Sequence, residues 1–358
     1  MSQRSPLLAV DLCSGAGGVS TGFRAAGLDV IAALDFDKDA RATYELNHPR
    51  TKVLADDLLL LSPRSFLRRI GKRKGEVDVL TACVPCQPYS SLASMNKRKD
   101  DPRYKLVNRV GDFVKTLAPR ALVMENVPGL IYDIRFKRLV GRLRRLNYGV
   151  WFGVVRASDF GVPQTRRRLV LIALRNRRDD DMPALTPNHQ ALKGKHLQAP
   201  SVRVVLGHVA KGGSAADPLM TPRTKFGTRT VATRIANIPK DGGGRKSLPA
   251  HLRLQCHRDL KRTRKSDARN VYGRMAWDGL APTLTTRCVT PACGRFLHPE
   301  ENRPITLREA AAFQTFPLHY RFSGSPGAIE MQIGNAVPLK LARAVALVVS
   351  HELTSTEP

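Results

Sequence analysis

Short apolar runs alternate with segments of helical periodicity over the first half of the chain. Buried strands are typical of such runs, and helices packed on a sheet are typical of apolar residues that recur every three or four positions. The predicted strands are 7–10, 30–34, 52–54, 77–81, 121–124, 150–155 and 169–173, and the predicted helices between them are 18–26, 38–47, 63–70, 107–117 and 136–143. This alternation predicts an α/β fold with a doubly wound, Rossmann-like sheet.

The pattern changes after about Arg178. The stretch up to Pro299 is basic, rich in glycine and proline, and without long periodic segments, so we predict a smaller, mostly irregular or β domain of short strands and loops. Helical periodicity returns at 306–314, with capping-box spacing at its start, and at 339–353. We therefore predict one domain from residues 1–178 together with 322–358, and a second from residues 179–321.

A glycine-rich turn follows the first predicted strand, and an acid follows the second. The turn reads Asp-Leu-Cys-Ser-Gly-Ala-Gly-Gly from Asp11 to Gly18, and the second strand ends at Asp35. Glycines at a strand-to-helix turn let a ligand approach the backbone, and an acid at this spacing suits ribose hydroxyls. Ser20 stands at the third glycine position of a dinucleotide fingerprint, so the residues predict a nucleoside site of unspecified type. A plain glycine turn is the alternative.

One thiol stands in a rigid loop at the end of the strand 77–81. The stretch from Thr81 to Ser91 reads T-A-C-V-P-C-Q-P-Y-S-S, with prolines close to Cys86 on both sides. Proline prevents a helix here, and an aimed thiol at the carboxyl end of a strand suits nucleophilic catalysis. The alternatives are a buried structural cysteine, a redox pair with Cys83, and half of a zinc site.

The distribution of charge along the chain indicates which kind of molecule the protein binds. The formal net charge is +29, and residues 193–274 contribute 19 Lys and Arg against 4 acidic residues, whereas residues 1–60 have a net charge of −2. Basic surface of this kind favours nucleic acid. A membrane partner is disfavoured, because the Pro/Gly-rich stretch 199–250 should not form an amphipathic basic helix and no run approaches the ~20 apolar residues of a span. Six cysteines, with no signal peptide, predict the cytoplasm.

Taken in order, these motifs resemble those of the C5-cytosine DNA methyltransferases, over nearly the whole chain. The motifs that carry the resemblance are the turn Asp11–Gly18, Pro85-Cys86-Gln87, Glu125-Asn126-Val127, the Q-x-R-x-R of 164–168, the stretch Arg303–Pro317 and Gly334-Asn335-Ala336-Val337-Pro338. The resemblance implies a stand-alone, prokaryotic type of enzyme that transfers a methyl group from S-adenosylmethionine to C5 of a flipped-out cytosine.

The resemblance also implies the site residues. Cys86 would be the nucleophile, Glu125 would bond the base, Arg168 would contact the cytosine O2, and Asn126 would hold the nucleophile loop or the Glu125 turn. Gln87 and Arg166 complete the implied catalytic set. The implied cofactor site consists of Asp11, Cys13, Ser14, Gly15, Gly17, Gly18, Asp35, Phe36, Asp57, Pro85, Asn335 and Val337.

The region 179–321 would be the target-recognition domain, with double-stranded DNA in the cleft between the domains. The expected DNA contacts are Ser90, Gln164, Arg223, Lys225, Arg229, Thr283, Thr285 and Thr286. A monomer is the simplest expectation, and a cognate restriction endonuclease would be a separate chain. The sequence departs from the family pattern at Cys13, Asp56 and Val84, which bears on cofactor affinity. A structural zinc ion held by Cys256, His257, Cys288 and Cys293 is a minor alternative, and no other metal is expected.

Overall fold

The computed structural model describes residues 5–85, 101–194, 197–222, 229–253 and 270–355. Its centre is a seven-stranded sheet in the order β3-β2-β1-β4-β5-β7-β6. The four pairings from β3 to β5 are parallel, and β7 lies antiparallel to both β5 and β6. The strands are β1 (Leu8–Leu12), β2 (Asp29–Leu34), β3 (Lys52–Leu54), β4 (Val79–Ala82), β5 (Ala121–Asn126), β6 (Tyr148–Arg156) and β7 (Arg167–Arg175). The predicted α/β class is confirmed.

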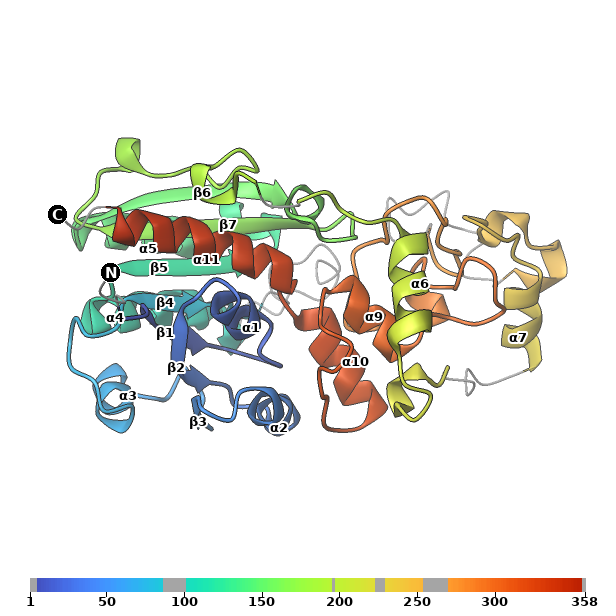
Figure 1. The fold of residues 1–358 in the computed structure, drawn as a ribbon, viewed down its shortest axis with the longest axis horizontal. Helices are drawn as coiled ribbons and strands as arrows, with labels where there is room; N and C mark the ends of the chain where they lie inside the picture. The colour runs from blue at the N-terminus through green and yellow to red at the C-terminus, as the bar shows by residue number, and fades with distance from the viewer. Residues whose placement is uncertain (1–4, 86–100, 195–196, 223–228, 254–269, 356–358) are drawn as a thin grey trace.

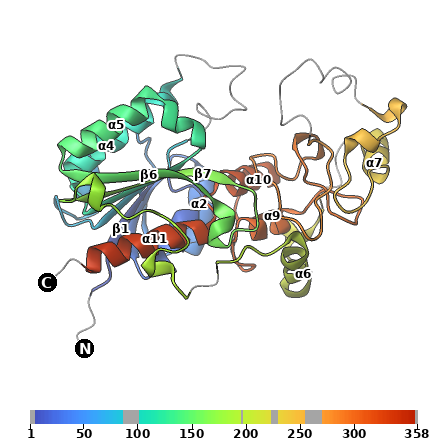
Figure 2. The ribbon, with the colours of Figure 1, turned by 90° about the horizontal axis from the view of Figure 1, so that it is seen from above.

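Helices cover both faces of the sheet, as Figure 2 shows for α4 and α5 on one side and α11 on the other. One hydrophobic core joins the sheet to α3 (Pro63–Arg69), α4 (Leu106–Leu117) and α5 (Ile134–Arg145). A second core joins the opposite face to α1 (Gly18–Arg24) and α11 (Leu339–Thr354). A Cβ at Gly22 would lie 2.6 Å from the Cβ of Ala342, so only glycine lets α1 and α11 approach this closely. α2 (Lys38–Asn47) follows β2.

The second part of the chain extends from one end of the sheet (Figure 1). Two further hydrophobic clusters hold it together, with α6 (Val202–Gly212), α9 (Leu307–Phe313) and α10 (Pro326–Asn335) in one and α7 (Arg229–Ala236) in the other. The predicted short strands are not found in the described residues between 179 and 304, where pairing is limited to isolated bridges such as Arg274 with Leu297. The predicted capping box of Thr306 and Glu309 is present at α9.

The stretch 199–250 does form an amphipathic helix, although not the basic, membrane-binding kind that was excluded. In α6 the residues Val202, Val205, Leu206 and Val209 recur at helical spacing and are buried, with Gly207 in the middle of the helix and Gly212 at its end. α7 is a second short helix in the same stretch. The domain boundaries remain a prediction, because α10 packs in the cluster of the second part and also contacts α2 of the first.

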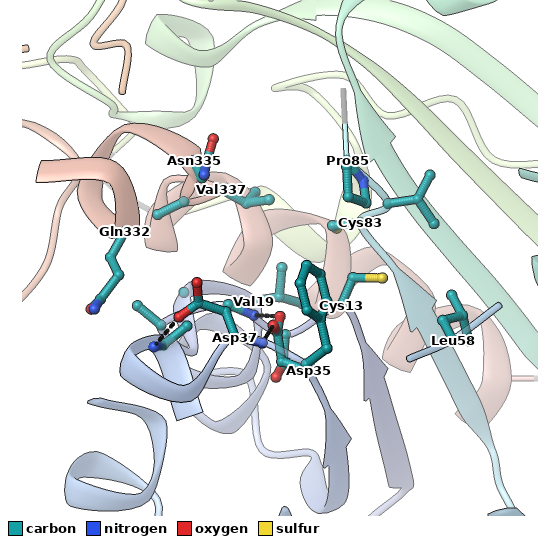
Figure 3. Close-up of a pocket in the computed structure, with 18 of the residues that line it drawn as sticks. Cys13, Val19, Asp35, Asp37, Leu58, Cys83, Pro85, Gln332, Asn335 and Val337 are labelled. Carbon is teal, nitrogen blue, oxygen red and sulfur yellow. Dashed lines mark hydrogen bonds between the residues drawn. The ribbon is translucent and has the colours of Figure 1, made fainter. Parts of the chain in front are cut away.

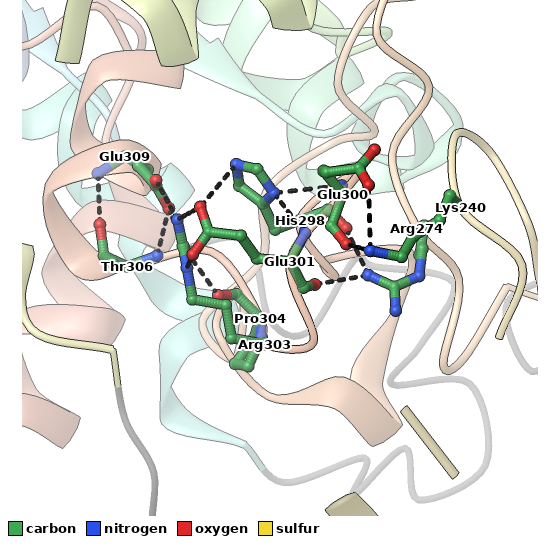
Figure 4. Close-up of polar contacts among 9 residues, drawn as sticks. All are labelled: Lys240, Arg274, His298, Glu300, Glu301, Arg303, Pro304, Thr306 and Glu309. Carbon is green, nitrogen blue, oxygen red and sulfur yellow. Dashed lines mark hydrogen bonds and ion pairs between the residues drawn. The ribbon is translucent and has the colours of Figure 1, made fainter. Parts of the chain in front are cut away.

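Buried arginines replace regular pairing in the second part. The guanidinium of Arg274, which is 0% exposed, donates to the backbone carbonyls of Ile235, Ile238, His298 and Glu301, and to the side chain of Asn302. Figure 4 shows the neighbouring group, in which Arg303 binds the carboxylates of Glu301 and Glu309. Arg274 is the donor that the described structure gives to the carbonyls of Ile238 and His298, whereas those of Ile235 and Glu301 also accept from backbone N–H groups.

The run Pro326–Thr354 is long and apolar enough to cross a membrane by length and composition alone. It is two helices, because α10 ends at Asn335 and α11 begins at Leu339. In its most apolar stretch 72% is buried inside the protein, and α11 packs on α1 and the sheet. These contacts identify the run as part of the core.

Candidate active site

A cavity of about 490 Å³ opens at the carboxyl ends of the central parallel strands (Figure 3). This is the place where open α/β sheets bind their ligands. Three groups of residues line it: the turns after β1, β2, β3 and β4, the segment 102–106 with the end of β5 and the start of β7, and α10 with the turn that follows it. The sequence motifs therefore converge on one space.

The glycine turn after β1 shapes the floor of this cavity. Cys13, Gly15 and Gly17 all have positive φ, at 58°, 52° and 87°, which bends the chain sharply before α1. A Cβ at Gly18 would lie 2.7 Å from the carbonyl oxygen of Val337, so the turn can touch the α10–α11 connection only through a glycine. Cys13, Gly15 and Gly18 line the cavity, as does Ser14.

Two residues predicted to bind the cofactor lie behind the turn and do not line the cavity: Asp11 and Gly17. Asp11 is fully buried, and its Oδ2 accepts a 2.6 Å hydrogen bond from Ser20, whose hydroxyl in turn accepts one of 2.7 Å from Tyr44. Burial raises the pKa of Asp11 to about 7, with a further contribution from Asp35. The contacts of Asp11 are those of a support for the turn.

Asp35 is held in a fixed direction by the backbone. The N–H of Gly15 donates to its Oδ2 at 2.7 Å, and the N–H of Asp37 donates to its Oδ1 at 2.9 Å. Burial, only partly offset by these bonds, raises the pKa of Asp35. The adjacent Phe36 lines the cavity with 69% of its surface exposed, and Asp57 lines it while accepting from the N–H of Leu59 at 2.8 Å.

Cys83 and Cys13 also line the cavity. Burial raises the pKa of both thiols well above the usual value, and the carboxylate of Glu125 adds to this for Cys83. Both thiols therefore belong to the neutral wall of the cavity. Cys86, the other member of the redox alternative, lies outside the described residues.

Glu125 and Arg168 form an ion pair at the mouth of the cavity. Arg168 Nε lies 2.8 Å from Glu125 Oε1, and the two side chains are only 11% and 13% exposed. Their strands explain the contact, because the end of β5 pairs antiparallel with the start of β7, where Asn126 faces Leu169. The sequence separates these residues by 43 positions, and the sheet brings them together.

Asn126 links this carboxylate to the nucleophile loop. Its Nδ2 donates to the carbonyl of Val84 at 2.9 Å, and its Oδ1 accepts from the N–H of Val127 at 2.9 Å. Asn126 therefore contacts both the loop after β4 and the turn after Glu125, and its role there stays a prediction. Pro85 lines the cavity. Cys86 and Gln87, as well as Ser90, lie outside the described residues.

Gln164 and Arg166 join the sheet to the second part of the chain. Gln164 is fully buried: it donates to the carbonyl of Phe313 and to Gln314, and it accepts from the N–H of Leu284. Because none of its surface is exposed, the predicted DNA contact does not fit its position, and its bonds give it a positioning role. Arg166 lines the cavity but donates to the carbonyls of Leu284 and Ala336.

The other predicted DNA contacts have mixed positions. Thr283, Thr285 and Thr286 are half-buried beside the catalytic edge, and a Cβ at Gly334 would overlap the backbone of Thr285. Arg229 is exposed at the start of α7. Arg223 and Lys225 lie outside the described residues, as do Cys256 and His257 of the zinc alternative. Of its other two cysteines, Cys288 is buried and Cys293 half-buried.

Several lining residues were not predicted. They come from three segments: Leu58 and Leu59, then Pro102, Arg103 and Leu106, and finally Met331 and Gln332. The leucines carry no signal that separates them from core residues. The third segment did carry a sequence signal, because Ser325 followed by Pro326 is typical of a helix start. The side chain of Ser325 caps α10 by accepting a hydrogen bond from the N–H of Ala328.

The comparisons with known proteins agree with this geometry. The family C-5 cytosine-specific DNA methylase matches residues 7–351. The chain is 32% identical to the Type II methylase M.HgiDII of Herpetosiphon aurantiacus over 94% of this chain and 93% of that protein, and 33% identical to the Type II methyltransferase M1.HphI of Haemophilus parahaemolyticus over 94% and 85%. Among solved structures, the fold resembles DNMT2 of Spodoptera frugiperda, with TM-score 0.65 and 17% identity over 96% of this chain and 99% of that one. The chain belongs to the C-5 cytosine-specific DNA methylases and is a DNA cytosine-5 methyltransferase.

Proposed function

We propose that this enzyme methylates one short duplex DNA motif, with S-adenosylmethionine as methyl donor and Cys86 as covalent nucleophile. The observation that carries the proposal is the Glu125–Arg168 pair at the mouth of the cavity, tied by Asn126 to the backbone two residues before Cys86. Curated relatives that match over 94% of the chain are Type II methylases and methyltransferases, which supports a place in a restriction-modification system.

The chemistry explains the residue types. C5 of cytosine is a weak nucleophile, and addition of the Cys86 thiolate to C6 gives C5 enamine character. When bound, S-adenosylmethionine supplies an electrophilic methyl group to this carbon. The C5 proton then leaves to water, the C6–S bond breaks, and the thiolate of Cys86 is restored. None of these atoms is accessible in a duplex, so the cytosine must be flipped into the site.

Glu125 and Arg168 would act on neighbouring atoms along one edge of the base. Glu125 would bond N3 and offset the charge that develops on the ring, because a carboxyl within hydrogen-bond reach can share a proton with the base. Arg168 would contact the cytosine O2. Their 2.8 Å ion pair fixes both directions before the base arrives, which is the preorganisation that such stabilisation requires. Arg166 would complete the positive surroundings of the thiolate.

The residues of the cavity fit S-adenosylmethionine. Asp35, directed by two backbone N–H groups, would accept from the ribose hydroxyls, and the exposed face of Phe36 would stack on adenine. Asp57 would bond the adenine amine, while Asn335 and Val337 would close the side formed by the connection after α10. The volume of about 490 Å³ accommodates a nucleoside with an amino-acid tail.

The second part of the chain would read the motif in the major groove. Thr283–Thr286 and Arg229 are the described candidates for DNA contact. A monomer suffices for this arrangement, because every described residue of the cavity comes from one chain. We place the enzyme in the bacterial cytoplasm, where its DNA substrate lies.

Base-resolution mapping of cytosine methylation tests the proposal. Wild type and Cys86→Ala would be expressed in a host that has no such enzymes, and equal protein levels would be verified. We expect methylation at one short motif with the wild type, and none with the variant. Methyl transfer onto a tRNA pool but not onto DNA would contradict the DNA substrate, and methylation by Cys86→Ala would contradict the covalent mechanism.

A further inference from the structure

The catalytic part carries as much positive charge as the region predicted to bind DNA. Residues 61–192 contain 27 Lys and Arg against 11 Asp and Glu, a net charge of +16, compared with +15 for residues 193–274. The densest segment is α5 (Ile134–Arg145), in which six of twelve residues are Lys or Arg. The reaction proposed above uses none of them.

The six cations of α5 fall into two groups. Arg135, Arg142 and Arg144 bind the carboxylates of Asp133, Asp112 and Asp179 at 3.0, 2.8 and 2.6 Å. Lys137, Arg138 and Arg145 are exposed, and in the part of the chain that the structure describes they make no ion pair. Half of the charge of α5 is therefore available to an anion from outside.

These three cations lie along one side of the helix. The buried face of α5 consists of Phe136, Leu139, Val140 and Leu143, so positions 134, 137, 138 and 145 run along the opposite face. We call Lys137, Arg138 and Arg145 the α5 stripe. The stripe lies on the outer surface of the sheet, on the side away from α11 (Figure 2).

The α5 stripe begins beside the active site. β5 ends at Asn126, the short helix η4 (Pro128–Tyr132) follows, and α5 starts two residues later. Here Tyr132 and Ile134 are 83% and 54% exposed. An exposed tyrosine followed by unpaired cations is a surface suited to sugar and phosphate, and helix rise gives positions 134 to 145 a length of roughly 16 Å.

We propose that the α5 stripe binds the phosphates of duplex DNA that flanks the methylated motif on the catalytic side. This rests on the proposed function. Each strand of duplex DNA carries one charge per about 3.4 Å of axis, so the roughly 12 Å from Lys137 to Arg145 spans about three or four phosphates of one strand, within reach of long side chains. Such contacts carry no sequence information. They should raise the affinity for DNA only when the duplex is long enough to reach the α5 stripe.

The test uses two duplexes with the same motif, once it is mapped: one that covers only the motif, and one extended by about one helical turn on each side. The variant K137E/R138E is compared with R64E/R68E on α3, which changes the net charge equally on exposed residues two helices away. Binding is measured as a function of salt, together with methylation rates. For K137E/R138E we expect weaker binding of the long duplex and a salt slope shallower by about two, with the short duplex bound and methylated as by wild type.

Three outcomes overturn the proposal. The first is an unchanged affinity and salt slope with the long duplex. The second is an equal loss for R64E/R68E, which would show a general charge effect. The third is an equal loss on the short duplex, which would place the contact inside the motif. Absence of methylation by the wild type would instead reject the proposed function, so the two failures are distinguishable.

Discussion

The edge of the sheet and the second part of the chain are built in different ways. At the edge, backbone pairing places each side chain: Glu125 and Arg168 meet because β5 and β7 pair in a fixed register. In the second part, side chains organise the backbone, and Arg274 alone binds four carbonyls from two separate segments. The first arrangement fixes chemistry, and the second leaves loops free to carry different contacts on the same frame.

The difference matters for where the enzyme tolerates change. A strand end is held by many bonds, so one substitution changes a contact without moving the frame. A loop region that depends on one buried guanidinium loses several bonds at once. We therefore expect the second part to unfold separately when its arginines are removed, while the cavity persists.

The substitution Arg274→Met should have the largest effect and tests whether the second part of the chain depends on one buried guanidinium. It leaves buried carbonyls without donors, and each unsatisfied group costs about 1–3 kcal/mol, so we expect the second part to lose about 3–5 kcal/mol of stability. Differential scanning calorimetry should show an early separate transition. DNA binding should be lost, whereas S-adenosylhomocysteine should still bind.

The control for this prediction is Arg321→Met, an exposed arginine near the start of the C-terminal helices. It removes the same charge and should change the stability by less than about 0.5 kcal/mol. If Arg274→Met lowered the stability of both parts together, in one transition with loss of ligand binding, the two regions would form one cooperative unit and the contrast would be wrong.

Asp11 offers a test in the first part of the chain, because its raised pKa makes the stability of the protein depend on pH. Burial raises its pKa from the usual 3.8 to about 7, so between these values the folded chain keeps a proton that the unfolded chain releases. The stability contributed by this group therefore falls as pH rises from about 4 to 7. Relative to wild type, Asp11→Asn should gain up to about 4 kcal/mol as pH rises from about 4 to above 7. Parallel pH curves in denaturant unfolding would reject this.

Asn126 tests whether the edge acts through geometry. Asn126→Ala removes the bond to the carbonyl of Val84, and we expect kcat to fall by about 100-fold, equivalent to about 2.7 kcal/mol, with little change in cofactor affinity. Asn126→Asp keeps the acceptor for the N–H of Val127 but loses the donor, so it should behave like alanine if the nucleophile loop is what matters. A wild-type kcat in Asn126→Asp would assign the effect to the Glu125 turn.

The sequence was informative where periodicity and strand ends decide the structure. The helix 38–47 and the strand 52–54 match their observed bounds, and the long final helix was placed within one residue. In the second part the signals were misleading, because glycine and proline at 199–250 suggested loops although α6 forms there with Gly207 in its interior. Bonds from buried arginines to backbone carbonyls leave no periodic trace, so no reading of apolar positions could find Arg274.

The same limit applies to the site. Motifs located Glu125, Arg168 and the glycine turn, since a short spacing defines each of them. They did not separate residues that face the cavity from those that support it, and Asp11, Gly17 and Gln164 proved to lie behind it. That distinction depends on which way each side chain points after the sheet has formed. A sequence motif does not specify this direction.

Phe36 gives the smallest effect and the cleanest separation of ligand binding from folding. Its side chain is 69% exposed, so Phe36→Ala should change the free energy of unfolding by less than about 0.5 kcal/mol. Loss of stacking on adenine should weaken S-adenosylhomocysteine binding by about 10-fold, which corresponds to about 1.4 kcal/mol. Calorimetric titration measures this, and Phe36→Tyr, which keeps the ring, is the matched control. Equal affinity for all three proteins would move the adenine away from Phe36 and reopen the orientation of the ligand in the cavity.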